Sequence, residues 1–178
     1  MTKLEELLEV YRTLCTHCDT LFSNAHREFK DDMECGRGCS RCCTIESVTE
    51  LEAFAIETFA KEHGLTLSEV TPSEERGTCA FLAEDGSCAV YPARPLICRT
   101  HGLILYDSET KQFAGSCPMN FKGRAPESVG RAAVVDTVKI AENLVRLNMA
   151  YLILTGRDPK RAERVNLVRL AKPFRVPS

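Results

Sequence analysis

The nine residues Cys35-Gly36-Arg37-Gly38-Cys39-Ser40-Arg41-Cys42-Cys43 contain four of the chain's ten cysteines, in the spacing C-x3-C-x2-C-C. Two glycines make this segment a poor helix on its own. On a helix the four cysteines would share one face, whereas in a turn Cys39 and Cys42 could chelate one ion. Either arrangement lets the sulfurs converge, and soft thiolates select zinc, iron–sulfur clusters or Cu(I). We therefore expect a metal to organise this segment.

Four more cysteines follow, at Cys79, Cys88, Cys98 and Cys117. The first two lie towards the open ends of a hairpin predicted over residues 79–91, because apolar runs flank the tight-turn pair Asp85-Gly86. Cys98 follows a proline-braced loop, and Cys117 precedes a proline, as some cluster-binding cysteines do. Eight thiolates could serve two tetrathiolate zinc sites, one four-iron cluster plus a second ion, or one cluster with spare thiols.

The remaining cysteines and the histidines have a simpler interpretation. Cys15 and Cys18 have C-x2-C spacing but fall on the apolar stripe of a long predicted helix, so we expect them to pack in the core. His101, three residues after Cys98, is the one histidine that we consider as a mixed ligand. His17, His26 and His63 lie on predicted helices and are expected to be surface residues.

Arginines accompany the cysteines in the sequence at positions 37, 41, 94 and 99. A tetrathiolate zinc site or an oxidised four-iron cluster carries a formal charge of about −2, and guanidinium groups would offset this charge and tune affinity or potential. Arg94 lies between Pro92 and Pro95 and is expected to have a fixed partner. We therefore name Arg94 and Arg99 as residues that interact with the bound cofactor.

Composition narrows the classes of function. The chain has 178 residues, is 44% hydrophobic and 27% charged, and carries a net charge of −2, which does not favour a nucleic-acid partner. The N-terminus lacks the apolar core of a signal peptide, and no stretch reaches the roughly 18 apolar residues of a membrane span. We expect a cytoplasmic protein, where thiols stay reduced and disulfides are disfavoured. Glycine-loop, G-x-S-x-G and H-E-x-x-H signatures are absent.

Periodicity predicts the elements that flank the cysteines. Apolar residues recur every three or four positions over 3–30, which predicts a long amphipathic helix. A second helix is predicted over 50–63, with a Thr49–Glu52 capping box and an inner stripe of Leu51, Phe54, Ala55 and Phe59. Residues 65–78 are expected to form a polar loop, and 103–106 a short strand. A helix from 131 or 137 to 155 and another from Asp158 to 171 complete the chain.

These elements predict a mainly α protein with a small β-hairpin, organised as a single domain over 1–178. The cysteine-cluster region covers 33–121, the N-terminal helix precedes it, and C-terminal helices over 131–171 follow it. No repeat or linker divides the chain. Oligomeric state and any protein or redox partner are not indicated by the sequence.

The cysteine pattern is similar to that of a known family. The group at 35–43 is followed by Cys79-x-Phe81-Leu82 and then by Gly86-x-Cys88-x-Val90-Tyr91-x-x-Arg94-Pro95-x-x-Cys98-Arg99. Together these motifs resemble the YkgJ-type cysteine-cluster family, whose motif is usually written C-x2-C-x2-C-C and whose members are described as zinc- or iron-chelating. The first gap here is x3, which affects the geometry expected at Cys35.

This resemblance implies a set of metal ligands and a function. The implied ligands are Cys35, Cys39, Cys42, Cys43, Cys79, Cys88, Cys98 and Cys117. Several members are labelled as containing iron–sulfur clusters, so we favour an iron–sulfur cluster, with 4Fe-4S as the cluster type, and keep Zn²⁺ as the alternative. The resemblance extends to the larger flagellin lysine N-methylases, but their activity is not transferred to this shorter chain. The hypotheses are an iron–sulfur protein with a redox role, a structural zinc module, or a metal chaperone or sensor that uses Cys15 and Cys18.

Overall fold

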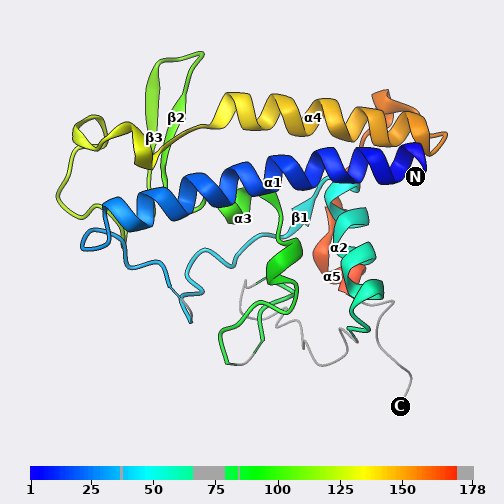
Figure 1. The fold of residues 1–178 in the computed structure, drawn as a ribbon, viewed down its shortest axis with the longest axis horizontal. Helices are drawn as coiled ribbons and strands as arrows, with labels where there is room; N and C mark the ends of the chain where they lie inside the picture. Colours follow the sequence, from blue (N-terminus) through cyan, green and yellow to red (C-terminus); the bar gives the residue numbers. More distant parts are fainter. Residues whose placement is uncertain (37, 66–78, 84, 172–178) are drawn as a thin grey trace. The chain divides into compact units, whose positions relative to one another are not determined.

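The computed structural model describes residues 1–36, 38–65, 79–83 and 85–171 (Figure 1). Arg37 and residues 66–78 of the polar loop predicted over 65–78 lie outside these residues. The chain divides into two compact units, each described here by itself. Unit 1 comprises Met1–Gly36 and Leu96–Leu147, and unit 2 comprises Arg37–Pro95 and Asn148–Ser178. The assignment of 1–178 to a single domain stays a prediction.

Unit 1 is built on the long helix α1, Lys3–Glu28. Its first turn is closed by a capping box in which Thr2 and Glu5 exchange hydrogen bonds, so the orphan N–H groups at this end find partners. The buried face consists of Leu8, Tyr11, Cys15, Cys18 and Ala25. The helix predicted over 3–30 is therefore confirmed, with its end two residues earlier.

A short helix and a small sheet complete unit 1. Helix α3, Leu96–Thr100, and the 3₁₀ turn η4, Arg131–Ala133, both contact α1. The sheet has the order β3-β2-β4, in which β2 (Ile104–Asp107) pairs antiparallel with β3 (Gln112–Gly115) and parallel with β4 (Val134–Asp136). The strand predicted at 103–106 is thus confirmed as β2.

The apolar core of unit 1 lies where α1 meets this sheet. It gathers residues from α1, β2, β4 and the loops between them, namely Ala25, Met33, Leu103, Ile104, Phe121, Val129, Ala133 and Val135. The loop from β3 to β4 contains the 3₁₀ turn η3, Pro126–Ser128, and packs Phe121 edge-on against Phe29, with ring centroids 5.8 Å apart. This unit therefore has a core without any contribution from a metal.

Unit 2 is organised around helix α2, Glu50–Glu62. The capping box of Thr49 and Glu52 is present as predicted, and Gly64 follows the helix with φ +59°, a conformation that glycine adopts without steric cost. The predicted inner stripe was only partly right. Leu51 is buried, but the other buried apolar residues are Ala53, Ile56 and Ala60, while Phe54, Ala55 and Phe59 are only partly covered.

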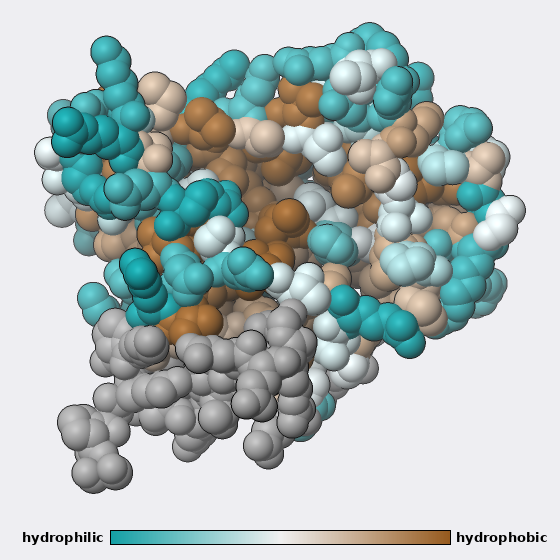
Figure 2. Space-filling view, turned by 180° about the vertical axis from the view of Figure 1, so that it is seen from behind, coloured by the Kyte–Doolittle hydropathy of each residue, from teal (hydrophilic) through white to brown (hydrophobic). Residues whose placement is uncertain are grey.

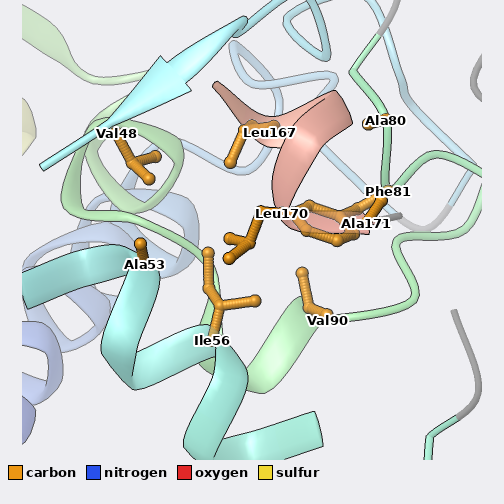
Figure 3. Close-up of a cluster of buried hydrophobic side chains, with 9 residues drawn as sticks. All are labelled: Val48, Ala53, Ile56, Ala80, Phe81, Val90, Leu167, Leu170 and Ala171. Carbon is orange, nitrogen blue, oxygen red and sulfur yellow. The ribbon is translucent and has the colours of Figure 1, made fainter. Parts of the chain in front are cut away.

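Four short elements complete unit 2. Strand β1 (Ser47–Val48) pairs antiparallel with β5 (Val165–Asn166), and α2 contacts both helix α5 (Leu167–Ala171) and the 3₁₀ turn η2 (Tyr91–Ala93). Figure 3 shows the resulting core, in which Ile56, Phe81, Val90 and Leu170 point towards one another. Unit 2 therefore also has an apolar core of its own.

One prediction for this unit was partly right and another was wrong. The hairpin predicted over 79–91 is present but short: Leu82 and Cys88 form an antiparallel bridge, flanked by hydrogen bonds from the Ala83 N–H to the Ser87 carbonyl (2.8 Å) and from the Ala89 N–H to the Phe81 carbonyl (2.9 Å). The chain then turns into η2 after Val90. The helix predicted from Asp158 to 171 is interrupted after the 3₁₀ turn η5, Pro159–Arg161. Asp158 does cap that turn, but residues 165–166 pair with β1 and Asn166 then caps α5. Pairing with β1 overrides the local helix preference.

Helix α4, Thr137–Leu154, contributes residues to both units and ends before Gly156, whose φ is +73°. The start at 137 is confirmed and the start at 131 is wrong, because 131–136 form η4 and β4. No helix among the described residues is long and apolar enough to cross a membrane. Hydrophilic residues lie beside hydrophobic ones over the face drawn in Figure 2. The mainly helical fold with a small hairpin is confirmed, and that hairpin is β2–β3.

A buried carboxylate links α2 to the chain after α4. Glu50 is 3% exposed, and its Oε1 accepts hydrogen bonds from the Glu163 N–H (2.8 Å) and from Arg157 Nη2 (3.3 Å). Its Oε2 accepts from Asn148 Nδ2 (3.0 Å), while Asn148 Oδ1 accepts from the Leu51 N–H (2.9 Å). Burial alone would raise the pKa of Glu50, but these donors outweigh it and lower the pKa.

We expect Glu50→Gln to lower the free energy of unfolding by about 1–3 kcal/mol at pH 7, because it removes the charge from a buried network. Since the folded-state pKa lies below 4.5, the difference between parent and variant should be present above pH 4.5 and should shrink as the pH falls through that lowered pKa. Urea unfolding at a series of pH values measures this difference in the free energy of unfolding. Glu142→Gln, which removes an exposed partner of Arg146, is the control and should change stability by less than about 0.5 kcal/mol. Equal losses of stability in both variants would contradict the assignment of Glu50 to a stabilising buried network.

Candidate metal centre

The eight cysteines of the implied ligand set fall into two groups. Cys35, Cys98 and Cys117 belong to unit 1, and Cys39, Cys42, Cys43, Cys79 and Cys88 belong to unit 2. All ten cysteines of the chain are free thiols. Each group is described within its own unit.

The segment 38–46 in unit 2 is a turn and an extended stretch, so the helical interpretation of the cysteine spacing was wrong. The Cys43 N–H donates to the Ser40 carbonyl (2.9 Å), which closes a turn around Cys42. Gly38 has φ +88°, a value that disfavours helix continuation. The turn alternative fits the backbone, and chelation of an ion by Cys39 and Cys42 stays a prediction.

This turn lies against the segment that carries Cys79. The Cys79 N–H donates to the Cys43 carbonyl at 2.7 Å. The thiol of Cys42 is hydrogen-bonded to Cys43, and this bond, followed by burial, raises the pKa of Cys42 strongly. A β-carbon on Gly86 would lie 3.4 Å from the Gly38 carbonyl oxygen, so the stretches before Cys39 and Cys88 also approach each other.

Cys79 and Cys88 are held in the same way as each other. Each is followed by an alanine and then by a core residue, and the N–H of that residue, Phe81 or Val90, donates to the cysteine sulfur. Phe81 and Val90 are each 1% exposed and point into the core drawn in Figure 3. Burial raises the pKa of both thiols, the N–H donors lower it, and the charges of Cys79 and Cys88 interact. Phe81 and Val90 thus each fill the core with the side chain and position a sulfur with the backbone N–H.

Arg94 has the fixed partner that its proline-flanked position predicts. Its guanidinium carbon lies 4.1 Å from the centroid of the Tyr91 ring, and Nη1 donates to the Tyr91 carbonyl (3.1 Å). The positive charge also lowers the pKa of Cys88. Arg94 therefore favours the thiolate form of one predicted ligand.

In unit 1, Cys35 is held by two polar side chains. Asn120 Nδ2 donates to the Cys35 sulfur (3.1 Å), and His26 Nε2 donates to the Cys35 carbonyl (3.1 Å). Cys117 accepts the Asn120 N–H at its carbonyl (2.9 Å), and Cys98 lies on α3. His26 is thus not a plain surface residue, whereas His17 and His63 are exposed.

Arg99 has a partner on α1, and its predicted interaction with the cofactor stays a prediction. It is 5% exposed, and its Nη1 forms an ion pair with Asp19 on α1. Close by, Cys15 and Cys18 are buried, which confirms their assignment to the core. Burial, with the charges of Cys15 and Asp19, raises the pKa of Cys18 to about 11, and Arg99 opposes this shift. His101 is partly buried, and its role as a mixed ligand stays a prediction.

Within residues 1–36, 38–65, 79–83 and 85–171, no three His, Cys, Asp or Glu side chains are already close enough to hold a metal ion. The structure brings the thiols together as pairs, Cys42 with Cys43 and Cys79 with Cys88. The set of eight ligands therefore stays a prediction.

The sequence analysis missed several residues that contact the sulfurs. The repeated pattern Cys-Ala-apolar at 79–81 and 88–90 is a signal that could have identified the N–H donors Phe81 and Val90. Asn120 lies 85 positions from Cys35, and no local pattern connects the two.

The fold and the cysteine groups define a small, mainly helical protein whose thiols are of the type that soft metals prefer. Residues 34–118 match the family described as "CxxCxxCC: Putative zinc- or iron-chelating domain". The resemblance drawn from the cysteine motifs is confirmed. No curated protein and no solved structure gave a significant match.

The raised pKa of Cys18 gives a test of its burial. Because the pKa is about 11 in the folded chain and 9.0 when unperturbed, the buried thiol contributes stability below pH 9 that is lost as the pH rises towards 11. Between these values the metal-free parent should lose up to about 3 kcal/mol more stability than Cys18→Ala. Denaturant unfolding at pH 8 to 11 measures the difference, and parallel curves would contradict it.

A second pH dependence concerns metal binding. The pKa values of Cys42, Cys79 and Cys88 are raised, so these thiols are protonated near neutral pH and a metal must displace their protons. We expect the affinity of the metal-free chain for Zn²⁺ to rise steeply from pH 6.5 to 8.5, with release of more than one proton per ion. Calorimetric titration in buffers of different ionisation enthalpy counts these protons. Binding without proton release would contradict the thiol ligands.

Proposed function

We propose that this protein holds an iron–sulfur cluster through cysteine thiolates and acts in electron transfer with a protein partner. The observation that carries the proposal is the pair of matched sulfur positions, where Phe81 and Val90 donate to Cys79 and Cys88 from within the core of unit 2. Hydrogen bonds to the sulfurs are among the factors that set the potential of a cluster. A cluster bound there would supply one-electron redox chemistry.

The donor set of unit 2 fits such a group. Its five cysteines are Cys39, Cys42, Cys43, Cys79 and Cys88, which exceeds the four thiolates that a cluster needs. The one histidine of this unit, His63, bonds through Nδ1 to the Phe59 carbonyl on its own helix (2.9 Å). Cysteine sulfurs are therefore the metal ligands that unit 2 supplies.

Charge supports the same assignment. Four thiolates around an oxidised four-iron cluster leave a formal charge of about −2. Arg94 lies close enough to Cys88 to lower the pKa of its thiol, and its stacking on Tyr91 holds the guanidinium in place. The role of this chain's residues is thus to position sulfurs, supply N–H donors to them and offset their charge.

Zn²⁺ is the second candidate, because Cys42, Cys43, Cys79 and Cys88 also supply the four thiolates of a structural zinc site. The chaperone or sensor hypothesis is weaker. It relied on Cys15 and Cys18 as an exchangeable pair, and both side chains are buried on α1.

Anaerobic purification followed by elemental and acid-labile sulfide analysis tests the proposal. Iron and sulfide in a brown protein with broad visible absorption is the expected result. A colourless protein that holds zinc alone, and that takes up no cluster when supplied with iron and sulfide under reducing conditions, would overturn the proposal in favour of the zinc module.

Substitution locates the ligands. Cys42→Ser and Cys43→Ser should each strip most of the bound metal and lower the melting temperature by several degrees, because metal binding stabilises the folded chain. The double variant Cys15→Ala, Cys18→Ala is the matched control and should keep its metal. If the control loses metal, or if neither serine variant does, the ligand assignment is wrong.

A further inference from the structure

The sulfur of Cys35 lies beside the buried amide of Asn120, in space that Gly102 leaves open because it has no side chain. Asn120 is 3% exposed, and its Nδ2 lies 3.1 Å from the sulfur and 2.8 Å from the Gly102 carbonyl. Its Oδ1 accepts the Glu34 N–H (2.9 Å). The amide is therefore fixed by two backbone groups, and it presents an N–H group to the sulfur.

The absence of a side chain at Gly102 provides the space in which the Cys35 sulfur lies. Its φ of +101° follows the end of α3, and a β-carbon there would lie 2.8 Å from the Cys35 sulfur and 3.1 Å from Asn120 Nδ2. Carbon and sulfur do not approach that closely, so any side chain at this position would displace the sulfur, the amide, or both. Glycine is required here for space as well as for backbone conformation.

The segment around Cys35 is fastened to the segment around Asn120 at several further points. The Phe121 N–H donates to the Asp32 carbonyl (2.7 Å), and Asp32 also pairs with Arg124 (2.9 Å). Lys122 pairs with Glu34 (2.6 Å). These contacts fix the backbone on both sides of the sulfur. A cysteine with no ligand role would not require a backbone fixed in this way.

We propose that Asn120 and Gly102 are positioning residues that hold the Cys35 sulfur as a metal-binding thiolate. The proposal rests on the metal-binding function proposed above, but it does not depend on whether the metal is iron or zinc. An amide N–H directed at a sulfur stabilises its anionic form, as outer hydrogen bonds do for other metal ligands. Loss of such a partner typically weakens metal affinity about 10–100-fold.

The chain offers a matched control for each residue. Asn148 is the other fully buried asparagine of the described residues, and its amide faces Glu50 and the Leu51 N–H in place of a sulfur. Gly115 has nearly the same φ as Gly102, +99°, yet a β-carbon there would meet nothing within 4 Å. Comparison of Gly102→Ala with Gly115→Ala therefore separates the close contacts at Gly102, with the Cys35 sulfur, Asn120 and Phe22, from the strain of a positive φ.

The test is titration of the full metal-free chain with Co²⁺, whose thiolate charge-transfer absorption reports each bound sulfur. The charge-transfer absorption that is lost in Cys35→Ser is the part due to the Cys35 sulfur. We expect Asn120→Ala and Gly102→Ala to weaken the Co²⁺ binding that this part of the absorption reports by about 10-fold or more. Asn148→Ala and Gly115→Ala should bind Co²⁺ as the parent does, even where their melting temperatures fall as far.

Parent-like titrations of Asn120→Ala and Gly102→Ala, or an unchanged spectrum in Cys35→Ser, would overturn the inference. If Asn120→Ala does not fold, Asn120→Asp serves instead, because it keeps the acceptor for the Glu34 N–H and loses the donor to the sulfur. Absence of iron and sulfide from the purified protein would remove the iron–sulfur proposal but would leave this comparison valid.

Discussion

A cysteine sulfur that is to bind a metal as a thiolate needs donors around it, because burial by itself favours the neutral thiol. In unit 2 these donors are backbone N–H groups of Phe81 and Val90, whose side chains belong to the apolar core. The direction of each N–H group is therefore set by the packing of its own side chain. Disturbing the core at either residue would move a sulfur, so packing and ligand position are coupled in this part of the fold.

The predictable part of the fold is the part governed by local rules. The apolar period of α1 and the capping box of Thr49 and Glu52 on α2 each act within a few residues, and each was found from the sequence. The failures lie where distant segments decide. Residues 165–166 pair with β1, more than a hundred positions earlier, and this pairing replaces the expected helix with a strand.

The same distinction explains how far the metal centre could be predicted. Residue type and spacing identified the cysteines, and the flanking prolines indicated a fixed Arg94. Spacing did not reveal that Cys35 and Cys39 belong to different units, because Gly36 and Gly38 free the backbone between them. Sequence proximity to Cys98 also did not reveal that Arg99 forms an ion pair with Asp19 on α1, because the two residues lie far apart in the chain.

The two apolar cores bear on what the metal contributes to the protein. A chain that folds only around its ion has little other means of burying apolar surface, as in small zinc modules. Here each unit has a packed apolar cluster of its own, and in unit 2 Ile45 from the segment 38–46 packs against that cluster. Metal binding therefore acts on a chain whose main helices have packing partners without it. The free energy of binding is then available to order the turns that carry the cysteines.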